Sequence, residues 1–156
     1  MKDRINQAVE NFLSGYNCSQ SVFLAFADLY NIDKETALHM SASFGAGIGR
    51  MRMTCGAACG MFMLAGFEKA AMKGEDKAAK SANYKLVQEL AHRFKEENGS
   101  LICAELLGLG KNPTITSNAE TRTKDYYKKR PCPRMVECAA RIFSEYLENK
   151  EQKDDL

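Results

Sequence analysis

Apolar residues recur through most of this chain at the three- and four-residue spacing of a single helix face. Near the N-terminus the spacing is kept by Ile5, Ala8, Phe12 and their neighbours, and similar stripes recur over residues 84–94 and 136–147. No stretch alternates apolar and polar residues between turn signals, as a half-buried strand does. The pattern therefore predicts an all-α domain, a compact helical bundle of about six to seven helices. The helices are expected over residues 2–14, 17–30, 33–44, 54–73, 75–96, 100–108 and 133–149.

The connections between these helices carry their own signals. Asn17 is a good N-cap for the second helix, and Gln20, three residues later, completes a capping box. A glycine-rich loop spans residues 45–50, between two predicted helices. Residues 109–131 read as a loop that leaves room for a short helix before Arg130.

Length and charge limit the classes of protein to consider. The chain has 156 residues, which suits one domain covering residues 1–156. The net charge of +2 gives no electrostatic reason to expect nucleic acid as a partner, and the basic run at residues 128–130 reads as a solvated helix end. No targeting signal or apolar stretch long enough for a membrane is visible, so a cytoplasmic location is expected. Six cysteines in a reducing compartment then indicate packing residues, metal or cluster ligands, or catalytic thiols.

Four of the six cysteines lie at predicted helix starts, namely Cys18, Cys55, Cys103 and Cys132. A helix start carries unpaired backbone N–H groups and the positive end of the helix dipole, and both favour a thiolate. We therefore expect the pKa of these thiols to fall below the ordinary value of about 8.5. Four such thiols together would suit an iron–sulfur cluster, which cysteine thiolates hold. Spacing alone leaves open whether the four meet.

The remaining two cysteines have simpler explanations. Cys138 lies six residues after Cys132 and points to another side of its helix, so packing in the core explains it. Cys59 lies one helical turn after Cys55. Packing is favoured for Cys59 too, but a role in resolving an oxidised Cys55, or in binding beside it, stays open.

The cysteines lie in motifs that resemble the C-GCAxxG-C-C family of putative redox-active proteins. The central motif is Cys-Gly-Ala-x-x-Gly at residues 55–60, and the resemblance extends from about Asn6 to Leu147. The flanking motifs are Asn17–Val22, Phe44–Arg50, Gly99–Gly108 and Cys132–Val136.

In this family four cysteines define the pattern, and the matching motifs place them at Cys18, Cys55, Cys103 and Cys132. The resemblance implies a small helical redox protein. An iron–sulfur cluster is suggested by similarity to the non-haem portion of split-Soret cytochromes. No Cys-x-x-Cys-His haem attachment motif is present in the chain.

The glycine-rich loop is interpreted as part of the same site. It does not match a dinucleotide fingerprint, because Arg50 stands where the third glycine would be and no strand precedes it. Gly47, Gly49 and Gly56 are expected to let the backbone approach the cysteines, and hence a bound cofactor, closely. Arg50 and Arg52 are candidates for stabilising thiolates or a cluster's negative charge, or else are exposed loop residues.

Three functions follow, in order of preference. The first is electron transfer or redox sensing through an iron–sulfur cluster held by the four cysteines. The second is metal-free thiol–disulfide chemistry, with Cys55 and Cys59 as the catalytic pair. The third is a structural zinc site. Whether the chain is an enzyme stays open, with an oxidoreductase or an electron carrier as the two possibilities. A redox partner protein is expected, no nucleic-acid or membrane partner is expected, and a homo-oligomer is left open.

Overall fold

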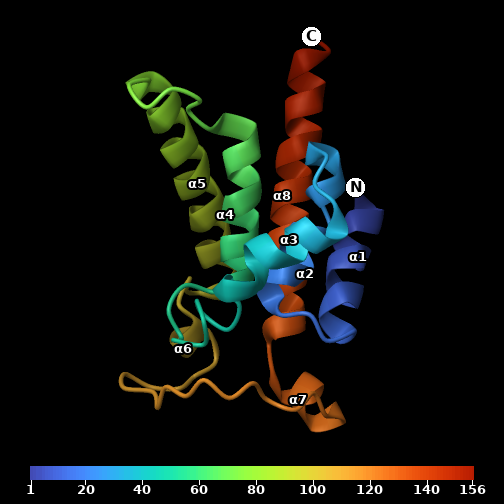
Figure 1. Ribbon diagram of the computed structural model, residues 1–156, viewed down its shortest axis with the longest axis vertical. Helices are drawn as coiled ribbons and strands as arrows, with labels where there is room; N and C mark the ends of the chain where they lie inside the picture. The colour runs from blue at the N-terminus through green and yellow to red at the C-terminus, as the bar shows by residue number, and fades with distance from the viewer.

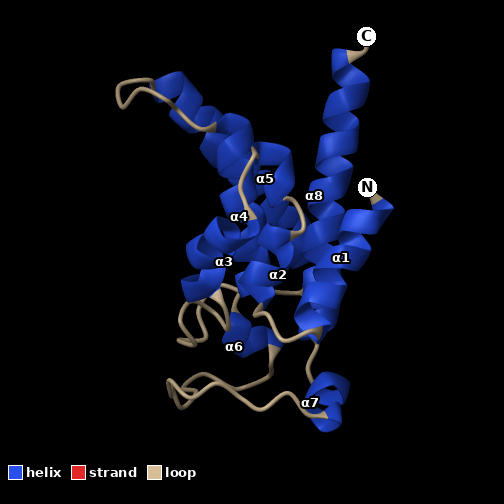
Figure 2. Ribbon diagram, turned by 45° about the vertical axis from the view of Figure 1, so that its right-hand side comes forward, coloured by secondary structure: helices blue, strands red, loops and turns tan.

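The computed structural model describes residues 1–156 and contains eight α-helices, two short 3-10 helices and no β-strand (Figures 1 and 2). The prediction of an all-α fold is confirmed. The count is higher than expected mainly because residues 124–129 form a helix of their own. The elements are α1 (Lys2–Leu13), α2 (Cys18–Leu24), η1 (Ala27–Tyr30), α3 (Lys34–Ser41), η2 (Ala42–Phe44), α4 (Gly56–Lys69), α5 (Lys77–Asn98), α6 (Cys103–Leu106), α7 (Lys124–Lys129) and α8 (Cys132–Asp154).

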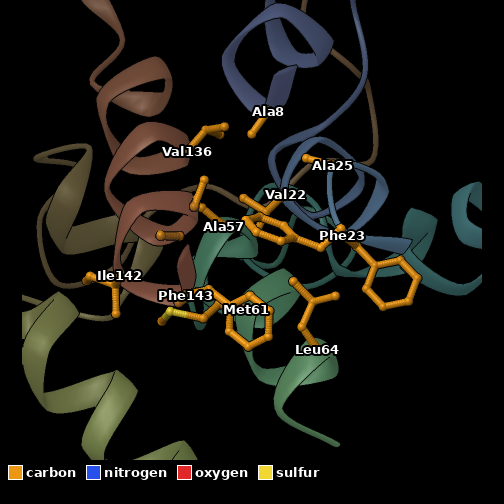
Figure 3. Close-up of a cluster of buried hydrophobic side chains, with 14 of the residues drawn as sticks. Ala8, Val22, Phe23, Ala25, Ala57, Met61, Leu64, Val136, Ile142 and Phe143 are labelled. Atoms are coloured by element: carbon orange, nitrogen blue, oxygen red, sulfur yellow. The ribbon is translucent and has the colours of Figure 1, made fainter. Parts of the chain in front are cut away.

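The core lies where α1, α2, α4, α5 and α8 pack together, and Figure 3 shows side chains from α2, α4 and α8 meeting there. Phe23 of α2, Met61 of α4 and Phe143 of α8 are fully buried. Burying a side chain of this size contributes about 1.5 to 3 kcal/mol. The ring of Phe143 packs edge-on against Phe26 with 5.1 Å between centroids. Most residues of the apolar stripes therefore point inward, as their spacing predicts, although Tyr84 is exposed.

The start of α2 is fixed by the predicted capping box. The Asn17 side chain accepts a hydrogen bond from the Gln20 N–H at 2.9 Å, and the Gln20 side chain accepts one from the Asn17 N–H at 3.2 Å. The Asn17 amide also donates to the Ala42 carbonyl at 2.9 Å. One residue thus caps α2 and ties it to the end of α3, immediately before Cys18.

Several helices begin at the same end of the molecule. In Figure 1, α4 and α8 both rise from the lower end, where α6 also lies, and the long segment between α6 and α7 crosses beneath them. This segment has no regular structure from residue 109 to residue 123, as the sequence predicts. None of the helices combines the length and the apolar character needed to cross a membrane.

Candidate functional site

The four cysteines singled out in the sequence surround one cavity of about 490 Å³. Cys18, Cys103 and Cys132 are the first residues of α2, α6 and α8, and Cys55 is the N-cap of α4. Cys18, Cys55 and Cys103 are each 8% exposed or less, while Cys132 is half-buried. Four helices thus direct their N-terminal ends, and one thiol each, toward a common space.

A short antiparallel bridge between Thr54 and Ile102 brings two of these cysteines together. The Cys55 N–H donates to the Leu101 carbonyl at 2.7 Å, and the Cys103 N–H donates to the Met53 carbonyl at 2.6 Å. Because each cysteine directly follows a bridge residue, the start of α4 is locked to the start of α6. The sequence shows no period-two pattern here, so this pairing was not predicted.

Two of the predicted glycines lie directly against cysteines. A Cβ atom added at Gly56 would lie 2.4 Å from the Cys18 sulfur, and one at Gly47 would lie 2.6 Å from the Cys103 Cβ. No larger residue fits at either position without displacing the cysteine. Gly49 also lines the cavity, but a Cβ atom added there would meet only the Ser43 carbonyl oxygen, at an ordinary contact distance of 3.7 Å.

The loop before α4 has an unusual backbone. Five consecutive residues, from Ala46 to Arg50, have φ angles between +54° and +76°, and Arg52 follows with φ +61°. L-residues are strained in this left-handed region by about 1–2 kcal/mol each, and runs of such residues are rare. Hydrogen bonds from the N–H of Arg50 to Gly45 and from the N–H of Met53 to Gly47 hold the turn. Its effect is to direct two arginines into the cavity.

Arginines form much of the remaining cavity wall, namely Arg50, Arg52, Arg122 and Arg130. Glu120 accepts hydrogen bonds from Arg50 at 3.1 Å and from Arg130, and it lies 3.5 Å from Arg52. Arg52 is buried and also donates to the Cys103 sulfur at 3.7 Å. The cavity therefore holds four guanidinium groups against one carboxylate.

Arg122 is anchored differently from the other three. Its guanidinium donates to the carbonyls of Phe12 and Tyr16 at 3.0 and 3.1 Å, and it stacks 4.3 Å from the centre of the Phe12 ring. Neither Arg122 nor Glu120 was expected at the site, because both lie in a segment without periodicity. The interpretation of residues 128–130 as a solvated helix end is wrong for Arg130, whose side chain turns to the cavity.

The expectation of lowered thiol pKa values is wrong for Cys18, Cys55 and Cys132. Burial raises the pKa of Cys18 and raises that of Cys55 well above its ordinary value. Burial, with the nearby Cys18 and Cys103, raises the pKa of Cys132 to about 12. Backbone N–H groups do act in the predicted direction, those of Ala57 and Ala58 on Cys55 for example. Desolvation outweighs them, because the thiols lie deeper than helix-start position alone implies.

The other two cysteines lie outside the cavity wall. The Cys59 thiol faces the Thr54 carbonyl at 3.9 Å, and burial raises its pKa to about 11. Cys138 belongs to the core, where its sulfur accepts from the Asn98 amide and its thiol donates to Glu97, each at 3.3 Å. Packing therefore accounts for Cys138, as the sequence indicates.

The sulfurs surround a space rather than meet at a point. No group of three or more histidine, cysteine, aspartate or glutamate side chains is close enough to hold a single metal ion. All six cysteines are free thiols. The arrangement places four thiols, backbone N–H donors and a surplus of positive charge around one cavity.

A protein-family model described as "Putative redox-active protein (C_GCAxxG_C_C)" matches residues 16–146 of the chain. The matched range includes all six cysteines and all four cavity arginines. No curated protein and no solved structure matches the chain.

Proposed function

Because the chain belongs to the C_GCAxxG_C_C family of putative redox-active proteins, we propose that it binds an iron–sulfur cluster and uses it for electron transfer or redox sensing. The proposed ligands are Cys18, Cys55, Cys103 and Cys132. The observation that carries the proposal is that these four thiols, each at a helix start, surround one cavity without converging on a point.

A zinc ion and an iron–sulfur cluster require different spacings of the four sulfurs. Zinc–sulfur bonds are about 2.3 Å, so four sulfurs around one zinc lie within roughly 4 Å of one another. No three ligand side chains are grouped closely enough for that. A cluster separates its cysteine ligands, because its iron and sulfide atoms fill the space between them.

Burial of the sulfurs favours ligands over reactive nucleophiles. Reactive cysteines lie in partly exposed, electropositive surroundings. Cys18, Cys55 and Cys103 meet the second condition but are nearly inaccessible. Cys59, the proposed partner of Cys55 in metal-free chemistry, lies outside the cavity wall, so thiol–disulfide chemistry has less support.

The surroundings of the sulfurs suit a redox centre. When bound, an iron–sulfur cluster supplies one-electron transfer, and hydrogen bonds to its sulfurs and nearby charge tune its potential. Cys55 receives N–H groups from Ala57 and Ala58, and Cys103 receives the guanidinium of Arg52. Gly47 and Gly56 keep the backbone close to these ligands, and the buried walls limit access of water. A redox partner protein and a cytoplasmic location remain predictions.

The test is anaerobic purification and reconstitution with iron and sulfide, followed by analysis of iron, sulfide and the visible spectrum. We expect the wild-type protein and Cys138→Ala to be brown, with equal iron content. Cys55→Ala and Cys103→Ala should each retain less than half of the wild-type iron content. A colourless protein that binds one zinc ion through the same cysteines would overturn the proposal. So would loss of iron in Cys138→Ala with none in Cys55→Ala.

A further inference from the structure

We propose that the cavity also contains a binding site for a small anion, a carboxylate or a comparable oxyanion, formed by Arg50, Arg52 and Arg130. In the structure the Glu120 side chain takes the anion's place. The site consists of arginines, and it rests on the proposed function only in that the bound anion would lie beside the redox centre.

The first support is the imbalance between donors and acceptors. Each guanidinium carries five N–H donors, whereas a carboxylate offers about four lone pairs. Arg50, Arg52 and Arg130 all converge on the one carboxylate of Glu120. Arg52 is only 9% exposed, yet its side chain has just this distant carboxylate and the Cys103 thiol as partners. A buried cation that is so sparsely paired favours a further anion.

The second support is the geometry of arginine itself. The planar guanidinium presents paired N–H groups that match carboxylate and tetrahedral oxyanions in a two-point contact. Three such groups around one position form a clamp for an anion. The occupant seen here, a carboxylate, shows which chemistry the clamp accepts.

The third support is the exposure of Glu120 and the irregular backbone of the segment that carries it. Its side chain is 38% exposed, and it lies in the irregular segment of residues 109–123, which forms one wall of the cavity through Ser117 and Ala119. Arg50 holds this segment by hydrogen bonds to Thr116 and to Glu120 itself. Segments with few buried contacts open at low cost in free energy. The carboxylate of a ligand can therefore displace the Glu120 carboxylate and accept the same hydrogen bonds from the arginines.

The fourth support is the strained backbone under two of the arginines. Arg50 and Arg52 both have positive φ angles, which L-residues adopt at a cost. Strain of this kind persists where the surrounding structure holds it and is concentrated at functional sites. Here its result is to turn both guanidinium groups into the same cavity.

The test is calorimetric titration of the reduced, cofactor-free protein with sodium succinate and, separately, sodium sulfate at low ionic strength. We expect Glu120→Gln to bind one of these anions at least tenfold more tightly than the wild type, because the internal competitor is lost. Arg50→Gln and Arg130→Gln should bind at least tenfold more weakly. Preference for succinate would assign a carboxylate ligand, and preference for sulfate an oxyanion.

Arg141→Gln is the matched control, because Arg141 also contacts several carboxylates but lies outside the cavity. Its anion affinity should equal that of the wild type. The inference is overturned by absence of binding to both the wild type and Glu120→Gln, or by equal affinities in the arginine variants. Misfolding cannot imitate the expected gain of affinity in Glu120→Gln.

Iron content, measured on the same variants, separates this inference from the proposed function. If the protein assembles a cluster but binds neither anion, the proposed function stands and the anion site is rejected. If the protein binds the anion through its arginines but never assembles a cluster, the anion site stands and the proposed cluster is rejected.

Discussion

The guanidinium of Arg52 donates a hydrogen bond to the sulfur of Cys103, with 3.7 Å between Nη1 and Sγ. The backbones of the two segments are joined as well, since the N–H of Ala104 donates to the Arg52 carbonyl at 3.2 Å. A cation carried by a left-handed loop is thus held against a thiol that begins another helix. Around a bound cluster, such a contact stabilises the more negative, reduced state.

Replacing Arg52 by glutamine should therefore lower the reduction potential of the reconstituted protein. A hydrogen bond to a charged group contributes about 1.5–3 kcal/mol. Only the part of this energy that differs between the two oxidation states shifts the potential, and about 1.4 kcal/mol corresponds to roughly 59 mV for one electron. A fall of up to about 60 mV is therefore expected. The reduction potential should fall less in Arg52→Lys, because lysine keeps the positive charge. An electrochemical titration followed by electron paramagnetic resonance measures both, and an unchanged potential at full iron content would contradict the contact's role.

Gly56→Ala and Gly66→Ala form a matched pair in α4. The new Cβ at position 56 would lie 2.4 Å from the Cys18 sulfur and 2.7 Å from the Phe44 carbonyl, whereas position 66 has open space. We expect Gly56→Ala to destabilise the protein by about 1–3 kcal/mol and to reduce iron loading. Gly66→Ala should stabilise it by up to about 1 kcal/mol through helix propensity. Urea unfolding decides; equal effects would contradict the close packing of Gly56 and Cys18.

Asn17→Ala removes the capping box that positions Cys18. Loss of an N-cap costs about 0.5–2 kcal/mol, and this one also breaks the bond to the Ala42 carbonyl. Asp76→Ala is the control, because Asp76 caps α5 by a 2.9 Å bond to the Ala79 N–H, outside the cavity. Both variants should lose stability in thermal unfolding, but only Asn17→Ala should change the rate at which a thiol reagent reaches the cysteines.

Cys59→Ala separates the cluster from metal-free thiol chemistry. Cys59 is buried beside the Thr54 carbonyl and does not line the cavity. If the cluster assignment holds, Cys59→Ala should keep the iron content of the wild type. A resolving role for Cys59 predicts instead that Cys55 accumulates as a sulfenate after mild peroxide. Mass spectrometry of the treated variant distinguishes the two results.

The pair of Arg4 and Asp28 should give a small acid-dependent stability. Two hydrogen bonds of 2.6 and 3.0 Å join them, and those bonds hold the pKa of Asp28 below its ordinary value of 3.8. Because the folded-state pKa is lowered, the contribution is complete above the ordinary pKa and is lost as the pH falls through the lowered one. Asp28→Asn should cost less than about 1 kcal/mol at pH 7, since the pair is exposed. Urea titrations should show the difference from wild type vanishing as the pH falls through the lowered pKa of Asp28; a constant difference would refute the ion pair.

The helices and the helix-start cysteines could be predicted because their signals are local. The stripe through Ala8 and Phe12 is buried as its spacing indicates, and the capping box of Asn17 and Gln20 forms as its two residues predict. Each signal depends on residues within one or two helical turns. Family resemblance and helix-start position selected the same four cysteines, and the structure places them around one cavity.

The charged wall of the cavity could not be predicted, because it depends on contacts between distant segments. Glu120 meets Arg50 across 70 positions, and Arg122 reaches carbonyls more than 100 positions away. The left-handed turn has no sequence signal either, since Ala46, Ile48 and Arg50 are residues that rarely adopt it. The thiol pKa values of Cys18, Cys55 and Cys132 shift opposite to the expected direction for the same reason. A helix start can be recognised from neighbouring residues, but the depth at which a thiol is buried depends on the whole fold.

We expect the left-handed turn at residues 46–50 to be among the parts of the molecule that warming releases early. Relaxing it recovers the backbone strain of Ala46, Ile48 and Arg50 without unpacking the helices around Phe143 and Met61. A heated or damaged copy would retain the circular dichroism of an intact helical protein while its thiols became open to reagents. Helical content is therefore a poor measure of whether the cavity around the cysteines is intact. Thiol accessibility is the quantity to follow during purification and storage.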